Sequence, residues 1–299
     1  MSGRIQVLLS TYNGERYLSE QLDSLLQQDY PDIQILIRDD GSADGTVALA
    51  KKYDEQYPNI RLIEDGNVGI VGSFFQLLLN ADKDAEYFAF SDQDDIWLPQ
   101  KLSRAVEHLH PSDSPRLYAS RTQYITANRQ PLGYSWLPKR PLGLRHALVQ
   151  NRLIGCTMVF NRATLKLLVS NLPESSLVHI HDWWVYLVVG ALGEVIFDEQ
   201  ATLLYRQHSS NAIGNNGATL QSRINRFTQN QKKCTQQAQA LQKCFGDQLD
   251  STSKMILDRF LNHRSTFLER VNYALSNEVY RQEPLNNLIL KMLIILDRV

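Results

Sequence analysis

Short apolar runs alternate with segments of helical periodicity over the first hundred residues. Buried strands are expected at four such runs, residues 5–9, 33–37, 60–63 and 87–90. Leucines at helical spacing follow Asn13-Gly14, a second helix is expected over 44–57, and residues 74–79 form a third apolar segment. Strands separated by helices of this length imply right-handed crossovers. The pattern therefore predicts an α/β fold with a mostly parallel sheet flanked by helices.

The pattern is less regular after residue 110, where prolines break residues 111–145 into short pieces. Further strands are expected at 117–125, 153–160, 195–197 and 203–205, and helices at 162–169 and 181–191. The Gly/Asn-rich stretch 211–217 predicts a linker. The residues after it are rich in glutamine and helical in pattern. We therefore predict an α/β domain over residues 1–215 and a helical C-terminal extension over residues 216–299.

Composition and charge exclude several classes of protein. The chain has 299 residues, of which 43% are hydrophobic and 21% charged, as in ordinary folded proteins. Its formal net charge of −1 argues against a nucleic-acid binder, which needs a broad basic face. Three cysteines without a CxxC pair indicate neither a zinc site nor a disulfide framework. The first apolar run is too short for a secretory signal, so a cytoplasmic protein is predicted.

An acidic cluster directly follows the fourth expected strand. Asp92, Asp94 and Asp95 put three carboxylates within four positions. The segments after the first two strands, at Thr11 and Asp39, should meet them at the same edge of the sheet. Carboxylate oxygens are the ligands that Mg²⁺ and Mn²⁺ prefer, and such a site can hold and neutralise a diphosphate. The alternative is a solvated acidic turn in which Asp95 caps the following helix.

Four motifs, in this order, resemble those of the family 2 glycosyltransferases of GT-A fold. They are Leu8-Leu9-Ser10-Thr11-Tyr12-Asn13, Arg38-Asp39-Asp40-Gly41-Ser42-Ala43-Asp44-Gly45-Thr46, Asn67-Val68-Gly69 and residues 91–99. The resemblance covers residues 4–208. It implies a Rossmann-like GT-A catalytic domain, a nucleotide-diphosphate sugar as donor, and Mn²⁺ or Mg²⁺ as cofactor.

The resemblance assigns the donor-side residues one by one. Thr11, Tyr12 and Glu15 match residues that lie beside the nucleotide. Asp39 matches the carboxylate that accepts a hydrogen bond from the base, and the N3–H of uracil or thymine is a suitable donor. A packed aromatic is the alternative for Tyr12. A purely structural role is the alternative for three further residues: Asp40, Ser42 and Asp44.

The family's DxD motif falls on Asp92 and Asp94. The resemblance implies that Asp94 binds the metal directly, that Asp92 lies nearer the ribose and phosphates, and that Asp95 orients both. Arg206 matches a residue that reaches the diphosphate, and His208 one that reaches the metal. A structural role stays the alternative for His208.

The acceptor side centres on Asp182 in the motif His181-Asp182-Trp183-Trp184. The resemblance implies that Asp182 is the general base, which must lie within hydrogen-bond reach of the attacking hydroxyl. Asp182 also stands at a helix start, where a capping role is compatible with that function. Gly155 and Cys156 match a segment that closes over the donor sugar, with Cys156 interpreted as a small buried residue. Trp183 is a candidate for stacking on a sugar, although packing is expected for at least one of the two tryptophans.

The helical extension lies outside the resemblance. Its last apolar run, residues 288–296, is too short to span a bilayer but long enough to lie in an interface. Residues 219–299 have a net charge of +5, against −6 for the rest of the chain. Peripheral attachment to the inner face of the plasma membrane is one hypothesis. A helical hairpin packed on the catalytic domain, or on a second subunit of a homodimer, is the other.

The motifs look most like those of bacterial rhamnosyltransferases of cell-surface polysaccharide assembly, such as that of O-antigen. The resemblance implies an inverting transfer, with dTDP-rhamnose as the first donor and UDP-hexose as the second, to a glycan or lipid-linked acceptor. One alternative is a sugar nucleotidyltransferase, which would carry a Gly-rich phosphate loop where Thr11-Tyr12-Asn13-Gly14-Glu15 stands. The other is a non-catalytic glycan-binding protein, which would need none of Asp92, Asp94 and Asp182.

Overall fold

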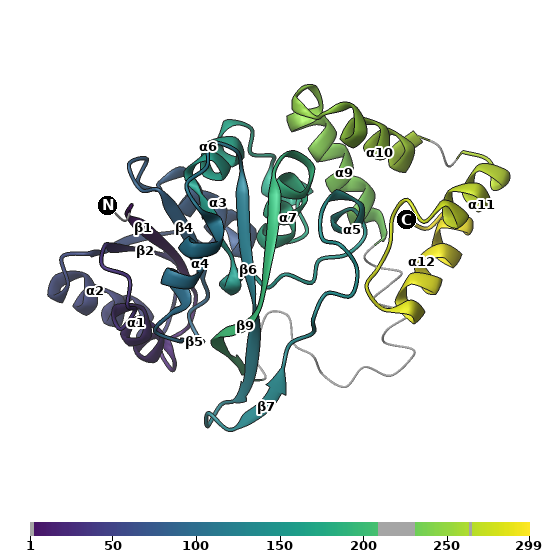
Figure 1. Cartoon of the computed structure of the whole chain (residues 1–299). Coiled ribbons are helices and arrows are strands. Elements are labelled where there is room, and N and C mark those ends of the chain that lie inside the picture. Colours follow the sequence, from purple (N-terminus) through teal and green to yellow (C-terminus); the bar gives the residue numbers. More distant parts are fainter. Residues whose placement is uncertain (1–2, 209–230, 263–264) are drawn as a thin grey trace.

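The computed structural model describes residues 3–208, 231–262 and 265–299 and shows an α/β domain followed by C-terminal helices (Figure 1). The first seven elements alternate strand and helix as predicted. They are β1 (Ile5–Thr11), α1 (Leu18–Leu26), β2 (Ile33–Asp40), α2 (Thr46–Gln56), β3 (Ile60–Asp65), α3 (Gly69–Leu79) and β4 (Tyr87–Ser91). β1 and β2 continue past their apolar runs, so that Thr11 and Asp39 become the last register pair between them.

The second part of the domain contains shorter elements. They are β5 (Ile96–Trp97), α4 (Lys101–Leu109), β6 (Arg116–Thr126), β7 (Pro131–Tyr134), α5 (Leu144–Ala147), η1 (Gly155–Thr157), β8 (Val159–Asn161), α6 (Arg162–Ser170), η2 (Ser175–Leu177), α7 (His181–Leu192) and β9 (Glu194–Gln207). Within the described residues these strands complete a nine-stranded sheet in the order β3-β2-β1-β4-β8-β6-β9-β5, with β7 paired to β6. The sheet is parallel from β3 to β4 and mixed beyond β4.

Two expected strands differ in the structure. Of the predicted strand at 153–160, residues 155–157 form a 3-10 turn, in which the amide of Gly155 donates to Asp182, and only Val159 and Phe160 belong to a strand, β8. The apolar character of residues 153–160 reflects burial on all sides. The separate strands predicted at 195–197 and 203–205 are one strand, β9, which pairs with β6 through register shifts near Ser120 and Arg121. The polar residues between them therefore interrupt the apolar pattern and not the strand.

Helices cover both faces of the sheet because successive strand residues point to opposite sides. Val7 and Leu9 of β1 pack in one cluster with residues of α1, α2 and α4. Leu8, between them, packs in the other cluster with residues of α3, α6 and α7. The carboxyl ends of β1, β2 and β4 therefore meet at one edge, fixed by a core layer on each side.

The C-terminal helices are α9 (Gln231–Phe245), η3 (Gly246–Gln248), α10 (Ser251–Asn262), α11 (Phe267–Ser276) and α12 (Pro284–Ile295). Phe245 at the end of α9 contacts the ring of Trp184 in α7, so the extension shares the core of the α/β domain. α11 and α12 lie side by side at the end of the molecule away from β1 to β3 (Figure 1). The predicted linker 211–217 and the predicted boundary at 215/216 lie outside the described residues.

The apolar run at 288–296 is divided between two environments. Leu290, Leu293 and Ile294 are buried, whereas Leu288 and Met292 are exposed on the other side of α12. Among the described helices, none is both long and apolar enough to cross a membrane. The run thus packs as part of a helical pair, and it also leaves apolar side chains uncovered.

Candidate active site

Asp39 is held rigidly at the carboxyl end of β2. Its carboxylate accepts hydrogen bonds from Thr11 Oγ1 at 2.8 Å, from Ser42 N at 2.7 Å and from Ser42 Oγ at 2.6 Å. Thr11 reaches it because the two residues are opposite each other in the parallel register. Asp39 and Thr11 are both buried. The predicted base-binding carboxylate therefore has one fixed orientation.

Other polar residues that follow β2 stabilise the backbone of the neighbouring loops. Asp40 accepts from the amides of Val68 and Gly69 at 2.9 and 3.0 Å at the start of α3, and it forms an ion pair with buried Arg38. Asp44 accepts from Thr46 N at the start of α2. These contacts agree with the structural alternative for Asp40 and Asp44.

The loop after β1 brings Tyr12 and Glu15 to the same edge. The backbone N and O of Tyr12 both bond to the side-chain amide of Gln93, at 2.8 and 3.0 Å, which ties this loop to the acidic cluster. The ring of Tyr12 is 50% exposed, so it is not a packed core aromatic. Glu15 accepts from Gly45 N at 3.0 Å. Gln93 is a site residue that the sequence analysis left without a role.

The acidic cluster divides into two groups. Ligand atoms of Asp92, Asp95 and Cys156 lie within 4.8 Å of one another. Asp94 points elsewhere, and its Oδ2 lies 2.8 Å from Nε2 of His208. Asp94 and His208, 114 positions apart, are therefore neighbours in the structure, and their binding of one metal stays a prediction. Asp95 does not cap α4, which begins at Lys101, and instead accepts from Arg206 N at 3.1 Å.

Burial and mutual repulsion raise the pKa values of these carboxyl groups, so ionising all of them together is unfavourable. Burial raises the pKa of Asp92 to about 7, and the charges of Asp94 and Asp182 act in the same direction. Burial also raises the pKa of Asp95 well above its ordinary value, as it does for the thiol of Cys156. Asp94 and His208 offer an oxygen and a nitrogen ligand to Mn²⁺ or Mg²⁺, and Asp92, whose pKa responds to the charge of Asp94, offers a further oxygen from the same loop. The residues present therefore fit the predicted metal.

Arg206 lies beneath the acidic loop, with its side chain 1% exposed. Its guanidinium donates to the carbonyl oxygens of Asp94 and Ala127, each at 2.9 Å, and pairs with Glu20. It also lies 4.5 Å from the centre of the Tyr17 ring. The direct diphosphate contact predicted for Arg206 is therefore not supported. The residue acts on the site through the position of Asp94.

Lys101 is a buried residue of the site that the sequence analysis missed. Its Nζ lies 4.1 Å from the centre of the Trp97 ring and 3.5 Å from Thr157 O. Burial lowers the pKa of Lys101 to about 7, while the interactions with Cys156 and Asp95 oppose that shift. The sequence contained a signal for the burial of Lys101. It precedes Ala105 by four positions, a spacing that puts both residues on the same, buried side of α4.

Asp182 lies in the first turn of α7, close enough for its charge to raise the pKa of Asp92. Its Oδ1 accepts from Asn151 Nδ2 at 3.0 Å, and its Oδ2 accepts from Gly155 N at 3.0 Å. Burial raises the pKa of Asp182 to about 7, and these hydrogen bonds moderate the rise. A pKa raised toward the operating pH is favourable for a general base. Asn151 is a second residue that the sequence analysis did not single out.

The neighbours of Asp182 are packed side chains. His181 stacks on Phe74 with ring centres 3.6 Å apart, and burial lowers its pKa to about 3, so it is neutral. Trp183 is buried and its indole donates to Ala147 O at 2.6 Å. Trp184 is also buried, so packing explains both tryptophans and sugar stacking by Trp183 is not supported. A Cβ at Gly155 would lie 2.9 Å from His181 Nε2, which explains the glycine.

The model of the family described as "Glycosyl transferase family 2" matches residues 6–164. The chain belongs to glycosyl transferase family 2. This glycosyltransferase is 30% identical over 217 residues to the dTDP-rhamnosyl transferase RfbG of Shigella flexneri, covering 70% of this chain and 74% of that protein. It is also 41% identical over 111 residues to the uncharacterized glycosyltransferase alr2836 of Nostoc sp., covering 37% and 34% of the two chains.

Solved structures show the same fold. TarS of S. aureus, residues 1–349 in complex with UDP-GlcNAc, superposes with a TM-score of 0.60 at 17% identity, covering 99% of the glycosyltransferase and 81% of that chain. The mannosyltransferase PcManGT of Pyrobaculum calidifontis, in complex with GDP-Man and Mn²⁺, gives a TM-score of 0.51 at 20% identity, covering 97% and 79%. The fold is therefore GT-A with a C-terminal helical extension. Family membership also removes the support for a sugar nucleotidyltransferase.

Proposed function

We propose that this glycosyltransferase moves rhamnose from dTDP-rhamnose to a hydroxyl of a growing, lipid-linked surface polysaccharide, with inversion at the anomeric carbon. The similarity to RfbG supports the donor, and UDP-hexose is the second candidate. The observation that carries the proposal is that Gly155 donates to Asp182 while the next residue, Cys156, lies within 4.8 Å of Asp92 and Asp95, so that one site contains both a candidate base and a candidate metal-binding motif.

Asp39 recognises the base of the nucleotide in this proposal. A carboxylate has about four acceptor positions, and three are used by Thr11 and Ser42. The remaining one can accept the N3–H of thymine or uracil. Thr11 fixes the carboxylate, the exposed ring of Tyr12 lies beside the nucleotide, and Glu15 holds the loop around Gly45. The donor side is thus built from pre-oriented groups, which reduces the entropic cost of binding.

Asp94, Asp92 and His208 would hold Mn²⁺ or Mg²⁺ at the diphosphate. When bound, the cation neutralises the charge that develops on the departing nucleoside diphosphate. Arg206 keeps Asp94 in place through the Asp94 carbonyl, and Asp95 is fixed by the backbone amide of Arg206. Two strands therefore supply the ligands: the acidic loop follows β4, and His208 follows β9.

Asp182 removes the proton of the acceptor hydroxyl as its oxygen attacks the anomeric carbon. The bond between that carbon and the diphosphate oxygen breaks as the new glycosidic bond forms, which inverts the configuration. Asn151 and Gly155 orient the Asp182 carboxylate through their hydrogen bonds to it. Cys156 packs against Asp92 and Asp95 as a buried, uncharged residue. The acceptor binds on the side of Asp182 away from the nucleotide.

The experiment that tests this function is a donor panel. The full chain is incubated with dTDP-rhamnose, UDP-glucose, UDP-galactose and GDP-mannose, and release of nucleoside diphosphate is followed with Mn²⁺, with Mg²⁺ and with chelator. We expect turnover of dTDP-rhamnose with Mn²⁺ or Mg²⁺ and its loss on chelation. Turnover that is equal with and without chelator would exclude the metal. No turnover of any donor would count against the transferase reaction itself.

Peripheral membrane contact belongs to the same proposal, since a lipid-linked acceptor lies at the bilayer surface. α11 and α12, or the residues next to them, expose large apolar side chains: Phe267, Leu268, Leu275, Leu285, Leu288, Met292 and Leu296. Such side chains can enter the interface between headgroups and acyl chains, and an anionic surface attracts the basic extension. A second copy of the chain is the other occupant that this apolar surface fits.

Vesicle binding separates these occupants. The full chain should sediment with phosphatidylglycerol vesicles, and L288S/M292S should lower the bound fraction several-fold, because both side chains are exposed and their loss leaves the core intact. Gln242→Ser, on the exposed side of α9, is the matched control. Equal recovery of the parent chain with and without vesicles, together with a dimer in sedimentation analysis that L288S/M292S dissociates, would assign the surface to self-association.

A further inference from the structure

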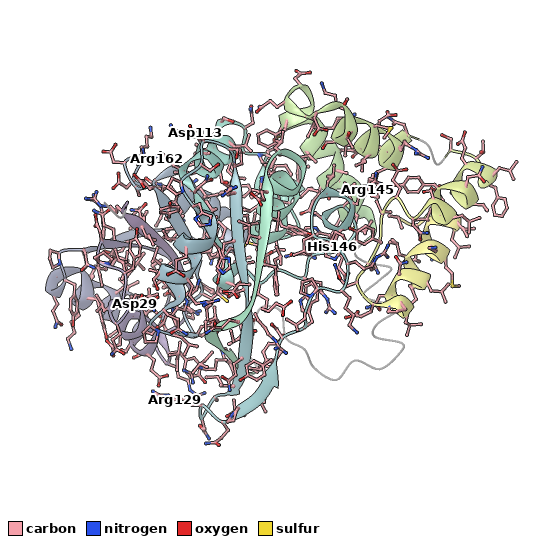
Figure 2. All side chains as sticks on the ribbon, in the orientation of Figure 1. Asp29, Asp113, Arg129, Arg145, His146 and Arg162 are labelled. Carbon is pink, nitrogen blue, oxygen red and sulfur yellow. The ribbon has the colours of Figure 1, made fainter. Side chains whose placement is uncertain are left out.

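The C-terminal extension contacts the segment that supplies Asn151 to the active site. Residues 280–283 are the last part of the loop between α11 and α12 and are called here the 280–283 connection. They pack against residues 139–152. Arg145 and His146 of this second segment, labelled in Figure 2, also contact the extension: Arg145 donates to Glu278 O at 3.1 Å, and the His146 and Tyr280 ring centres are 6.2 Å apart. Residues far apart in the sequence therefore form one polar interface next to the site.

Gln282 is the centre of this interface and is buried. Its Oε1 accepts from the backbone amides of Lys139 and Arg140, both at 3.0 Å, and its Nε2 donates to Arg140 O at 3.1 Å. Its backbone amide donates to Gln150 Oε1 at 3.0 Å. One residue thus joins both ends of the 139–152 segment.

The neighbours of Gln282 extend the contact in both directions. Arg281 is buried, and its Nε donates to Val149 O at 3.2 Å. Glu283 forms an ion pair with Arg152. The 280–283 connection therefore contacts residues 149, 150 and 152, on both sides of Asn151.

Residues 150–154 lie in neither a helix nor a strand, so no ladder of hydrogen bonds fixes their position. Asn151 nevertheless has to present its amide to Asp182 at 3.0 Å. Its Oδ1 is already occupied by Leu153 N at 2.9 Å, which sets the direction of the amide. The backbone on either side is held by Gln150 N, which donates to His146 O at 2.9 Å, and by Arg152 O, which accepts from Trp136 Nε1 at 2.9 Å. The 280–283 connection adds a contact to the backbone at Val149 O and contacts to the side chains of residues 150 and 152.

We infer that the 280–283 connection is a positioning element of the active site, which holds residues 139–152 at both ends and thereby keeps Asn151 against Asp182. The inference rests on the proposed function, because it requires Asp182 to act as the base. The C-terminal extension then contributes to the geometry of the active site, and sugar transfer depends on it. Gln282 is a positioning residue, since it contacts neither the donor nor Asp182.

The test compares Gln282→Ala with Gln282→Glu and with Gln242→Ala, an exposed glutamine of α9. Gln282→Ala removes three hydrogen bonds to residues 139 and 140, whereas Gln282→Glu keeps the acceptors for the two amides. Two quantities are measured in Mn²⁺: the number and affinity of dTDP sites by calorimetry, and release of dTDP from dTDP-rhamnose per dTDP site. UDP and UDP-glucose replace these probes if the donor panel selects uridine.

Gln282→Ala should lower turnover per site by about ten- to a hundredfold, because a small displacement of a reacting group is costly. Its dTDP affinity should stay within about twofold, because donor contacts lie on the other side of the site. Gln282→Glu should recover most of the turnover, and Gln242→Ala should match the parent chain. A loss of dTDP sites in proportion to turnover, or equal turnover per site in Gln282→Ala and Gln242→Ala, would overturn the inference. A parent chain without turnover of any donor would instead refute the proposed function.

Discussion

Replacing Asp182 with asparagine should lower sugar transfer by about 10²- to 10⁴-fold, the range expected for loss of a general base. Asparagine has nearly the same shape but cannot take a proton from the acceptor hydroxyl. Binding of dTDP in Mn²⁺ should be retained, because the predicted donor contacts at Thr11, Asp39 and Asp94 are unchanged. Transfer and binding are measured by release of dTDP from dTDP-rhamnose and by calorimetry with dTDP.

The pH profile gives the same test a second readout. Burial raises the pKa of Asp182 to about 7, and the ionised form is the active one. The transfer rate of the parent chain should therefore fall as the pH decreases below about 7 and level off above it. In Asp182→Asn the part of this dependence that belongs to Asp182 should disappear, and any that remains is assigned to Asp92, whose pKa burial also raises to about 7.

A control is needed because neutralising a buried carboxyl group also affects folding. Asp198→Asn removes another buried carboxylate, one that accepts from Arg104 at 2.8 Å and Tyr118 at 2.8 Å, away from the site. Its thermal unfolding temperature should fall with little change in turnover per dTDP site. If Asp182→Asn behaved in the same way, Asp182 would be a structural residue.

Much of the fold and of the donor side could be predicted from local pattern. Apolar runs spaced by helices determine a parallel arrangement, and that arrangement alone brings Thr11, Asp39 and the acidic cluster to one edge. The contact between Asp94 and His208 has no such local signal. It depends on β9, which pairs with β6 along its length and ends near the acidic loop. The two apolar runs of β9 predicted where this strand ends but not that it is one continuous strand.

The role predicted for Arg206 and the omission of Lys101 share a physical cause. A charged residue in a sequence is usually expected to face solvent or to bind a ligand, because charged side chains are rarely buried. Arg206 and Lys101 are both buried, where carbonyl oxygens, an aromatic ring and neighbouring acids compensate their charges. Such compensation comes from residues distant in sequence, so no spacing rule identifies it. The segment around Gly155 was assigned to a strand for a related reason. Its apolar residues are buried by tertiary contacts, while its backbone follows the hydrogen bond to Asp182.

Replacing Asp94 with asparagine should weaken binding of dTDP in Mn²⁺ by at least about a hundredfold, because loss of an outer-sphere partner alone costs ten- to a hundredfold in metal affinity. The amide that replaces the carboxylate is a neutral and poorer ligand for a hard cation. Contact with His208 Nε2 does not compensate, since the imidazole brings no negative charge to the cation. Calorimetry with dTDP, in Mn²⁺ and again in chelator, measures the effect.

The same substitution should act in the opposite direction without metal. A carboxylate near the diphosphate repels it, so Asp94→Asn should bind dTDP in chelator as well as the parent chain or more tightly. Damage to the fold would weaken binding under both conditions, which makes the change of sign diagnostic. Asp84→Asn, on the turn before β4, removes one exposed charge and should change neither value. Weaker binding of dTDP to Asp94→Asn in chelator would show that Asp94 supports the loop around the nucleotide. Equal binding of Asp94→Asn and the parent chain in Mn²⁺ would exclude it as a metal ligand.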